Sequence, residues 1–331
     1  MVKRKGVTLG RYLFRRALSS SIVLATSVVL VFLSIRVLPG DPVLARLGAA
    51  TEVTPEALEA LRVEAGLDRS LLAQLFSWLS HAVRGDLGVS YISQFPVTQL
   101  VGERIPVTLE LTFFIILLSC IFSLILAPLS ILKPGGKLDR FIGSLTSIGL
   151  SIPGFVTGII FILIFSLTLQ WLPSLGYVPI TEDLGKNLQL LIMPSITGAL
   201  TATPYLVRYL RASMLEIKQS SFIRTAEGKG LSDSRIMFRH ILPNSLVPTL
   251  TMLGLIVGYT LSGVIVIEYM FGLPGIGSLA IEGAFKRDYA IIQGVSLVII
   301  SLFILTTLLF DILCGIVDPR LRVTKERQNE I

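Results

Sequence analysis

Long apolar runs separated by short polar segments make up most of this chain. A helix that crosses about 30 Å of hydrocarbon needs about 20 apolar residues, because it rises about 1.5 Å per residue. Six stretches meet this requirement: Ala17–Leu38, Val107–Leu132, Phe141–Leu169, Leu188–Val207, Asn244–Ile267 and Ala290–Phe310. The last four contain no Asp, Glu, Lys or Arg. The pattern predicts an all-α polytopic membrane protein with six transmembrane helices in a single domain over residues 1–331.

The composition agrees with a membrane protein. Of the 331 residues, 15% are charged and 52% are hydrophobic, whereas a soluble globular chain carries about 25% charged residues. These values exclude a disordered chain and argue against an ordinary soluble enzyme. The basic residues before Ala17 also suit a secretory signal peptide, but the apolar stretch exceeds the usual length of about 7–15 residues. We therefore interpret Ala17–Leu38 as the first span.

The distribution of basic residues predicts the orientation. Four segments, residues 1–16, 133–140, 208–243 and 311–331, hold 20 of the 29 Lys and Arg residues. Short loops rich in Lys and Arg stay on the cytoplasmic side of a membrane. Both termini are therefore expected in the cytoplasm, with residues 39–106 outside. The same asymmetry accounts for the net charge of +7, and no basic patch interleaved with aromatic residues indicates a nucleic-acid partner.

The segment 39–106 is expected to form a short helical outer loop. One helix starts at Thr54–Pro55 and stops at Gly66, and a second runs from about Ser70 to Arg84. Two short helices without a metal or a disulfide do not form a stable domain alone, so they should lie on the outer membrane surface against the bundle. The segment is either a cap over the spans or a docking surface for an external partner.

Polar and helix-breaking residues within the spans suggest two further features. Hydroxyls on one face of the second span either bond back to helix carbonyls or line a wet path. The candidates for lining the path are Thr112, Ser119 and Ser123. Four prolines should each kink or locally open a span: Pro128, Pro153, Pro194 and Pro204. Small residues at four-residue spacing, such as Gly254 and Gly258, favour close helix packing in lipid.

The chain lacks the usual motifs of catalysis. It contains no G-x-x-x-x-G-K-[ST] phosphate loop, no H-E-x-x-H, no Cys-x-x-Cys and no G-x-S-x-G elbow. Its two cysteines, Cys120 and Cys314, lie far apart in apolar runs, and two histidines do not make a histidine-rich metal site. Asp311 near the last span is expected to pair with a cytoplasmic Arg or Lys. We therefore expect no catalytic residue, no metal and no cofactor in this chain.

The basic loop over residues 208–243 is the most informative part of the sequence. It reads as two short helices. The first is expected at Ser213–Lys229 and is ended by Gly230 in the left-handed conformation. Ser232 should cap the second helix, which Pro243 should halt before the fifth span. On these grounds alone, the loop could also be an amphipathic segment on the inner leaflet.

This loop resembles the cytoplasmic signature of ABC importer permease subunits. That signature is E-A-A, three residues, Gly, nine residues and I-x-L-P. The matching positions are Thr225, Ala226, Gly230, Leu242 and Pro243. Arg224 stands at the Glu position and His240 at the Ile position. The peptide/nickel branch of the family usually shows R-T-A in place of E-A-A.

Other segments resemble the same branch and follow in the same order. They are Leu38–Pro42, Gly85–Gly88, Pro96–Val97, Ile105–Thr112, Pro274–Gly277, Arg287–Tyr289 and Asp318–Arg320. The resemblance covers nearly the whole chain and is strongest to the B-type permease of dipeptide and oligopeptide importers. One departure is that the usual R-A-K-G run is Glu227–Gly230 here, which is more flexible and less basic.

The resemblance implies a type I ABC importer permease fold with cytoplasmic coupling helices. The chain would sit in the cytoplasmic (inner) membrane of a bacterium or archaeon and form half of a pathway for di- or oligopeptides. Its partners would be two ATP-binding subunits at the cytoplasmic face, a second homologous permease, an extracytoplasmic solute-binding protein and the lipid bilayer. The expected coupling residues are Arg224, Thr225, Ala226, Glu227, Gly230, Ser232, Leu242 and Pro243.

Other functions remain as alternatives. Relatives of such permeases carry nickel, glutathione-like compounds, opines or oligosaccharides, so the solute stays open. A channel or an ion-coupled carrier would work without an ATPase, and a carrier would usually place charges near the membrane midplane. A membrane-embedded enzyme would need a catalytic pair. Co-purification of ATPases bound at residues 208–243 distinguishes the importer permease from both.

Overall fold

The computed structural model describes residues 9–37, 54–64 and 67–317, and helices dominate all three ranges. The expected stop at Gly66 and the family-like segments Leu38–Pro42 and Asp318–Arg320 lie outside these ranges. Over the described residues, β structure is limited to one isolated bridge between Val89 and Pro96. The all-α prediction is confirmed.

Each predicted span has a counterpart among the described helices. Five helices are long and apolar enough to cross a membrane, and a bent pair makes a sixth if it counts as one span. The five are α1 (Leu9–Val37), α5 (Val97–Ile131), α8 (Leu184–Lys218), α11 (Leu242–Met270) and α13 (Tyr289–Val317). The bent pair consists of α6 (Lys137–Ser151) and α7 (Gly154–Phe161), which continues as the π-helix η1 (Ile162–Thr168).

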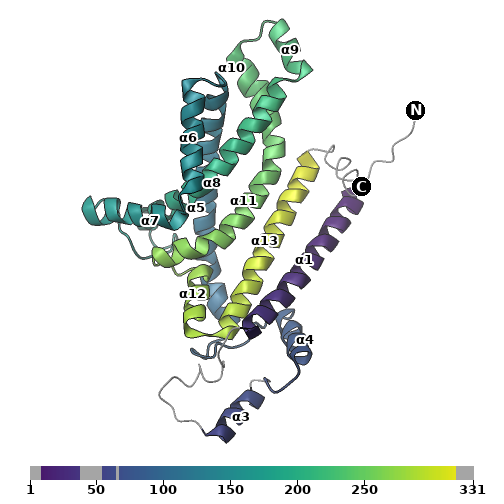
Figure 1. Cartoon of the computed structure of the whole chain (residues 1–331), viewed down its shortest axis with the longest axis vertical. Helices are drawn as coiled ribbons and strands as arrows, with labels where there is room; N and C mark the ends of the chain where they lie inside the picture. The colour runs from purple at the N-terminus through teal and green to yellow at the C-terminus, as the bar shows by residue number, and fades with distance from the viewer. Residues whose placement is uncertain (1–8, 38–53, 65–66, 318–331) are drawn as a thin grey trace.

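The third span departs most from a straight rod. It bends by 97° between α6 and α7, and α7 points away from the bundle axis (Figure 1). Pro153 disfavours helical backbone at the preceding residue, and Ile152 is accordingly extended, with φ −93° and ψ 120°. The expected kink at Pro153 is therefore a full break. The other three prolines lie inside the continuous helices α5 and α8.

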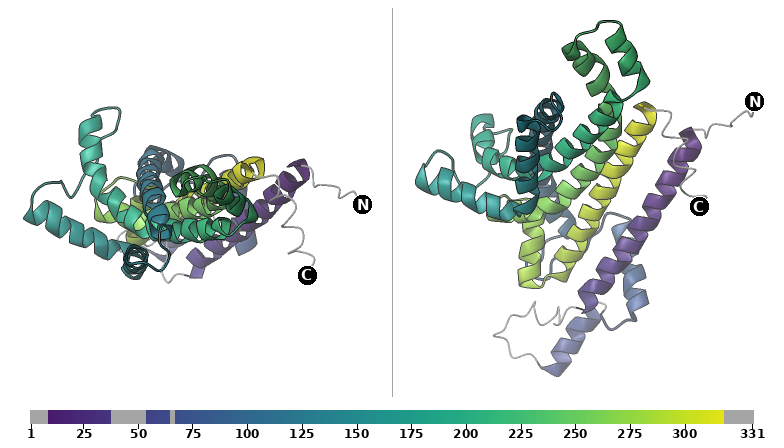
Figure 2. Two further views of the ribbon diagram at one scale, coloured as in Figure 1. Left: turned by 90° about the horizontal axis from the view of Figure 1, so that it is seen from above. Right: turned by 45° about the horizontal axis from the view of Figure 1, so that its top comes forward.

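The helices form a bundle whose two ends carry different short elements (Figure 1). At one end lie α9 (Ser221–Gly228) and α10 (Asp233–Ile236). At the opposite end lie α12 (Ile276–Lys286), α4 (Leu71–Ala82) and α3 (Pro55–Glu64). The helix α1 packs beside α13 at the edge of the bundle (Figure 2).

Packing inside the bundle relies on small residues and a compact apolar core. The core contains fully buried side chains such as Leu111, Ile115 and Phe271. A Cβ added to Gly254 or Gly258 would collide with a phenylalanine of α13, so these glycines let α11 approach α13 closely. Many large apolar side chains on the outside of the helices are exposed, as suits surfaces that face lipid or another chain.

The helices α1 and α13 are also joined by charge. Arg16 forms an ion pair with Asp311, whose side chain is nearly buried. The expected pairing of Asp311 with a basic residue is confirmed. The pair joins the first part of α1 to the last part of α13, so these two helix ends lie side by side.

The two helices expected between the first and second spans form where the sequence predicts them. The hydroxyl of Ser70 accepts a hydrogen bond from the Ala73 N–H at the start of α4, and Gly85 beyond its end has φ of +83°. Within α4, Leu75 is the buried residue. Trp78 lies against Phe32 of α1, with ring centroids 6.3 Å apart. The segment is attached to the bundle at this point, and its role as cap or docking surface stays open.

Candidate functional site: the coupling loop and the membrane cavity

The loop begins where α8 ends, later than the sequence predicts. We expected one helix over Ser213–Lys229, and this is wrong. The helix α8 continues to Lys218, and a separate helix, α9, follows at Ser221. Ser220 breaks the helix because its backbone is extended, with ψ of 154°, while its hydroxyl donates to the Ile217 carbonyl at 2.6 Å.

Gly230 ends α9 as the sequence predicts. Its φ is +76°, and its N–H donates to the Glu227 carbonyl at 2.9 Å. The Leu231 N–H donates to the Ala226 carbonyl at 3.3 Å. These two bonds make a Schellman motif, which a left-handed glycine closes. The motif sets the direction in which the chain leaves α9.

One face of α9 is buried and the other is free. Ile223 and Ala226 are buried in an apolar cluster with residues from the neighbouring ends of α5, α6 and α8. The other members of this cluster are Ala127, Ile131, Ile142, Val207, Leu210, Met214, Ile236, Met237 and Ile241. Arg224, Thr225 and Glu227 are exposed. The helix is therefore fixed to the bundle while its polar side chains remain available to a partner.

The second half of the loop differs from expectation in two respects. Ser232 stands at the N-cap position of α10, and its carbonyl accepts the Ile236 N–H at 2.9 Å, but its side chain makes no capping hydrogen bond. Pro243 does not halt the helix: α10 continues through the π-helix η2 (Met237–Ile241) directly into α11. Pro243 is the second residue of α11 and directly follows the wider π turn. Leu242 is half-buried and Pro243 exposed.

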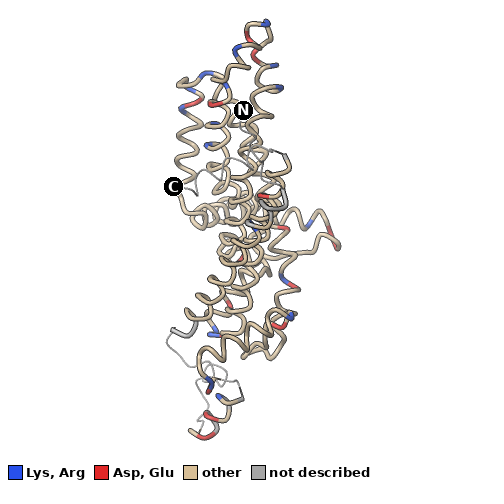
Figure 3. The backbone as a smooth tube through the Cα atoms, turned by 90° about the vertical axis from the view of Figure 1, so that its right-hand side faces the viewer, with Lys and Arg blue, Asp and Glu red and all other residues tan. Residues whose placement is uncertain are grey.

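The free surface of this loop is basic and aromatic. An open hollow of about 620 Å³ lies against α10 and η2. Its lining residues are Ser232, Ser234, Arg235, Phe238, Arg239 and Pro243. Figure 3 shows Lys and Arg gathered at this end of the molecule, and Phe222 is exposed beside them on α9. Arginine and aromatic side chains are the types that most often anchor protein interfaces.

The three candidate path hydroxyls on α5 are all buried. Ser119 donates to the Ile115 carbonyl at 2.7 Å and lies 3.5 Å from the Ala199 carbonyl of α8. Ser123 donates to the Cys120 carbonyl at 2.9 Å. Thr112 is 5% exposed. Two of the three thus bond back to their own helix, and their contact with a solute stays a prediction.

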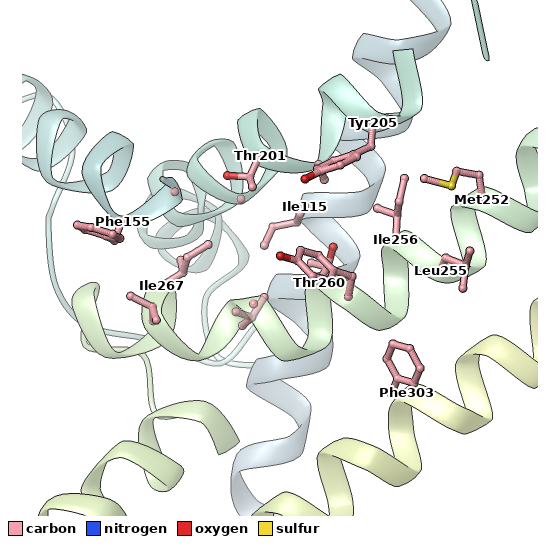
Figure 4. A pocket seen from close by; sticks show the side chains of 17 residues that line it. Ile115, Phe155, Thr201, Tyr205, Met252, Leu255, Ile256, Thr260, Ile267 and Phe303 are labelled. Atoms are coloured by element: carbon pink, nitrogen blue, oxygen red, sulfur yellow. The ribbon is translucent and has the colours of Figure 1, made fainter. Parts of the chain in front are cut away.

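The structure adds a cavity that the sequence analysis missed. It has a volume of about 520 Å³ and lies between α8 and α11, with contributions from α5, α7 and α13 (Figure 4). Its lining has no charged residue, and its hydroxyls are Thr201, Tyr205, Tyr259 and Thr260. These hydroxyls come from two helices, and their convergence on one cavity could not be seen from the sequence.

Comparisons with known proteins agree with this architecture. The family described as binding-protein-dependent transport system inner membrane component matches residues 119–323, and its N-terminal component matches residues 9–112. A probable peptide ABC transporter permease of Sinorhizobium fredii is 35% identical over 95% of this chain and 100% of its own length. A glutathione transport system permease of Pectobacterium atrosepticum is 36% identical over 94% of this chain and 98% of its own.

A solved structure shares the fold. A chain of the MetNI methionine ABC transporter aligns with a TM-score of 0.56 at 18% identity, covering 66% of this chain and 97% of that one. Permeases of this family work with ATP-binding subunits and a substrate-binding protein. The chain belongs to the family of binding-protein-dependent transport system inner membrane components, as a multi-pass permease subunit of an ABC importer in which separate subunits hydrolyse ATP.

Proposed function

We propose that this chain, as a single transmembrane domain, forms half of the translocation pathway of an ATP-driven importer of short peptides. The coupling loop carries this proposal. Its helix α9 is fixed to the bundle by buried Ile223 and Ala226, while Arg224 and Glu227 stay exposed. A rigid helix with a free polar face is suited to receive force from an ATPase docked on it.

The proposed orientation places the coupling loop and both termini in the cytoplasm and residues 39–106 outside. The concentration of basic residues in four segments supports it. The ion pair between Arg16 and Asp311 supports the placement of both termini on the same side of the membrane. This pair joins the N-terminal part of α1 to the C-terminal part of α13.

In the proposed mechanism, two ATPases close on ATP and move the docked α9 helices. The attached spans then change between inward-open and outward-open arrangements by sliding of packed helices. ATP can drive this change only by binding one arrangement better than the other. A second, homologous permease supplies the other half of the path, and the uncharged cavity between α8 and α11 forms part of this half.

The proposed solutes are di- and oligopeptides, because relatives named as peptide permeases match nearly the whole chain. Glutathione is the second candidate, since the glutathione permeases reach a similar identity. The partner binding protein is expected to contribute much of the selectivity.

The test is purification of the chain with its native partners, followed by reconstitution in proteoliposomes. We expect ATP-binding subunits to co-purify. We also expect ATP, enclosed in the proteoliposomes with the ATP-binding subunits, to drive uptake of radiolabelled tri-alanine from outside. Glutathione serves as the competing solute. Uptake that proceeds without ATPase subunits, or that follows an ion gradient, would contradict the proposal and favour a carrier.

A further inference from the structure

The ends of α6 and α8 that lie nearest the coupling loop are joined by an ion pair. We propose that Arg211 and Asp139 are positioning residues that transmit the movement of the coupling loop to α6 and, through it, to the wall of the membrane cavity. The inference rests on the proposed function, since it assumes that ATPases dock on α9.

The geometry of the pair is that of a strong, directional contact. Arg211 Nε donates to Asp139 Oδ1 at 2.9 Å, and its Nη2 donates to Oδ2 at 2.8 Å. The Gly135 N–H also donates to Oδ2 at 2.9 Å. Asp139 is only 8% exposed. A bidentate arginine–carboxylate pair fixes relative orientation as well as distance.

A second contact prevents α6 from turning against α8. Arg208 lies one turn before Arg211 on α8, and its Nη2 donates to the Ser147 hydroxyl of α6 at 2.8 Å. Close packing adds to these contacts, since a Cβ on Gly149 would meet the Pro204 ring of α8 at 2.8 Å. The helix α6 is thus held at three levels along α8 and should follow it as one body.

Both ends of this body lead to functional regions. On one side, Ile142 of α6 belongs to the same buried cluster as Ile223 and Ala226 of α9. On the other side, α6 stops at Ser151, and within four residues the chain reaches Gly154 and Phe155, which line the cavity. A displacement of α9 that carried α8 and α6 would therefore move the cavity wall.

The pair is placed for transmission and not only for stability. An exposed ion pair contributes little to the free energy of folding. Removing one partner of a pair whose carboxylate is buried is more costly, because it leaves the other charge buried and unpaired. Arg211 lies beyond the predicted fourth span, in the extension of α8 that leads into α9. Loss of the pair should loosen the end of α6 nearest the coupling loop from α8 while leaving the exposed face of α9 intact.

The test compares Arg211→Gln and Asp139→Asn with the native permease in the reconstituted complex. The solute is whichever of tri-alanine and glutathione the native complex takes up faster. Both variants should bind ATPases normally yet lower uptake per ATP hydrolysed by about threefold to tenfold. Arg211→Lys, which keeps the charge, should recover part of the native uptake per ATP hydrolysed. The double variant should lower this ratio no further than either single variant. Lys137→Gln, an exposed neighbour on α6, is the control and should change nothing.

A distance measurement gives a readout that needs no solute. Spin labels at Arg140→Cys on α6 and Glu216→Cys on α8, both exposed, are introduced after replacement of Cys120 and Cys314. Their separation should be the same in ATP-free and ATP-bound native complexes. With Arg211→Gln it should differ between the two states, because the end of α6 that carries Asp139 no longer follows α8.

The outcomes separate this inference from the proposed function. A native complex without ATP-driven uptake contradicts the proposed function. If the native complex takes up solute and Arg211→Gln leaves the uptake per ATP hydrolysed unchanged, this inference alone is contradicted. Poor assembly of the variants with a normal ratio per assembled complex also overturns it, because the pair would then serve folding only.

Discussion

The carboxylate of Glu268 in the last turn of α11 accepts the Thr108 hydroxyl of α5 at 2.6 Å. The side chain of Glu268 is fully buried. Its second oxygen accepts the Gly277 and Ser278 N–H groups at 2.8 and 3.2 Å, so it caps the start of α12 from a different helix. Thr108 in turn accepts the Ile276 N–H at 2.9 Å. One carboxylate thus ties α5, α11 and α12 together.

Replacement of Glu268 by Gln should destabilise this end of the bundle. The amide keeps only one acceptor oxygen, so either the Thr108 hydroxyl or the backbone N–H groups lose their acceptor, at a cost of about 1–3 kcal/mol. Thermal unfolding of the purified protein in detergent measures the effect. Glu282→Gln is the matched control. Glu282 is 42% exposed in its pair with Arg104, so its replacement should change the melting temperature little. Equal melting temperatures for Glu268→Gln and the native protein would contradict the network's importance.

Gly230→Val should uncouple the loop without preventing membrane insertion. A β-branched residue at φ of +76° costs about 1–3 kcal/mol locally, although no atom lies within 4 Å of the added Cβ. The direction of α10 should change, and solute uptake should fall at matched permease levels. Gly228→Ala in α9 is the control: its Cβ also meets nothing within 4 Å, and its backbone is helical. Normal uptake and ATPase binding by Gly230→Val would show that the loop does not couple through this turn.

Arg224→Ala should weaken assembly with the ATP-binding subunits in a salt-dependent way. The side chain is exposed on α9, so its attraction to a partner is screened at high ionic strength. Pull-down of ATPase subunits at low and high salt measures this. Arg69→Ala, exposed near the start of α4 at the opposite end, should leave the pull-down unchanged. An Arg224→Ala defect of the same size at every salt concentration would speak against an electrostatic contact.

The proposed topology predicts opposite labelling of two sites. Single cysteines at Glu59 and Gln328, in a chain without Cys120 and Cys314, are treated with an impermeant thiol reagent in cells whose outer surface is accessible. The cysteine at position 59 should react, and that at position 328 should react only after the membrane is opened. The reverse labelling pattern would show that the chain has the opposite orientation in the membrane.

The spans and the coupling turn could be predicted because their causes are local. Apolar runs of membrane length mark the helices, and a glycine at the end of a short polar helical pattern marks the turn at Gly230. The break at Ser220 was missed because the surrounding residues favour helix on both sides. The continuation of the helix through Pro243 depends on a π turn that residue types alone do not indicate.

The contacts that join distant segments were out of reach of sequence reasoning. Glu268 and Thr108 are 160 residues apart, and Arg211 and Asp139 are 72 apart. Each residue alone looks like a polar group near a span end. The only local hint was the Pro274–Gly277 run, whose Gly275 and Gly277 leave room for the Glu268 carboxylate.

The break at Ile152–Pro153 has a consequence for the solvent around it. Ser151, Ile152 and Pro153 are all exposed in the single chain, and the backbone there is not helical. Hydrocarbon offers no partner for a free carbonyl or N–H, so irregular backbone at membrane depth is stable only against protein or water. We therefore expect the bend to face protein or water, and not acyl chains, where the third span crosses the membrane.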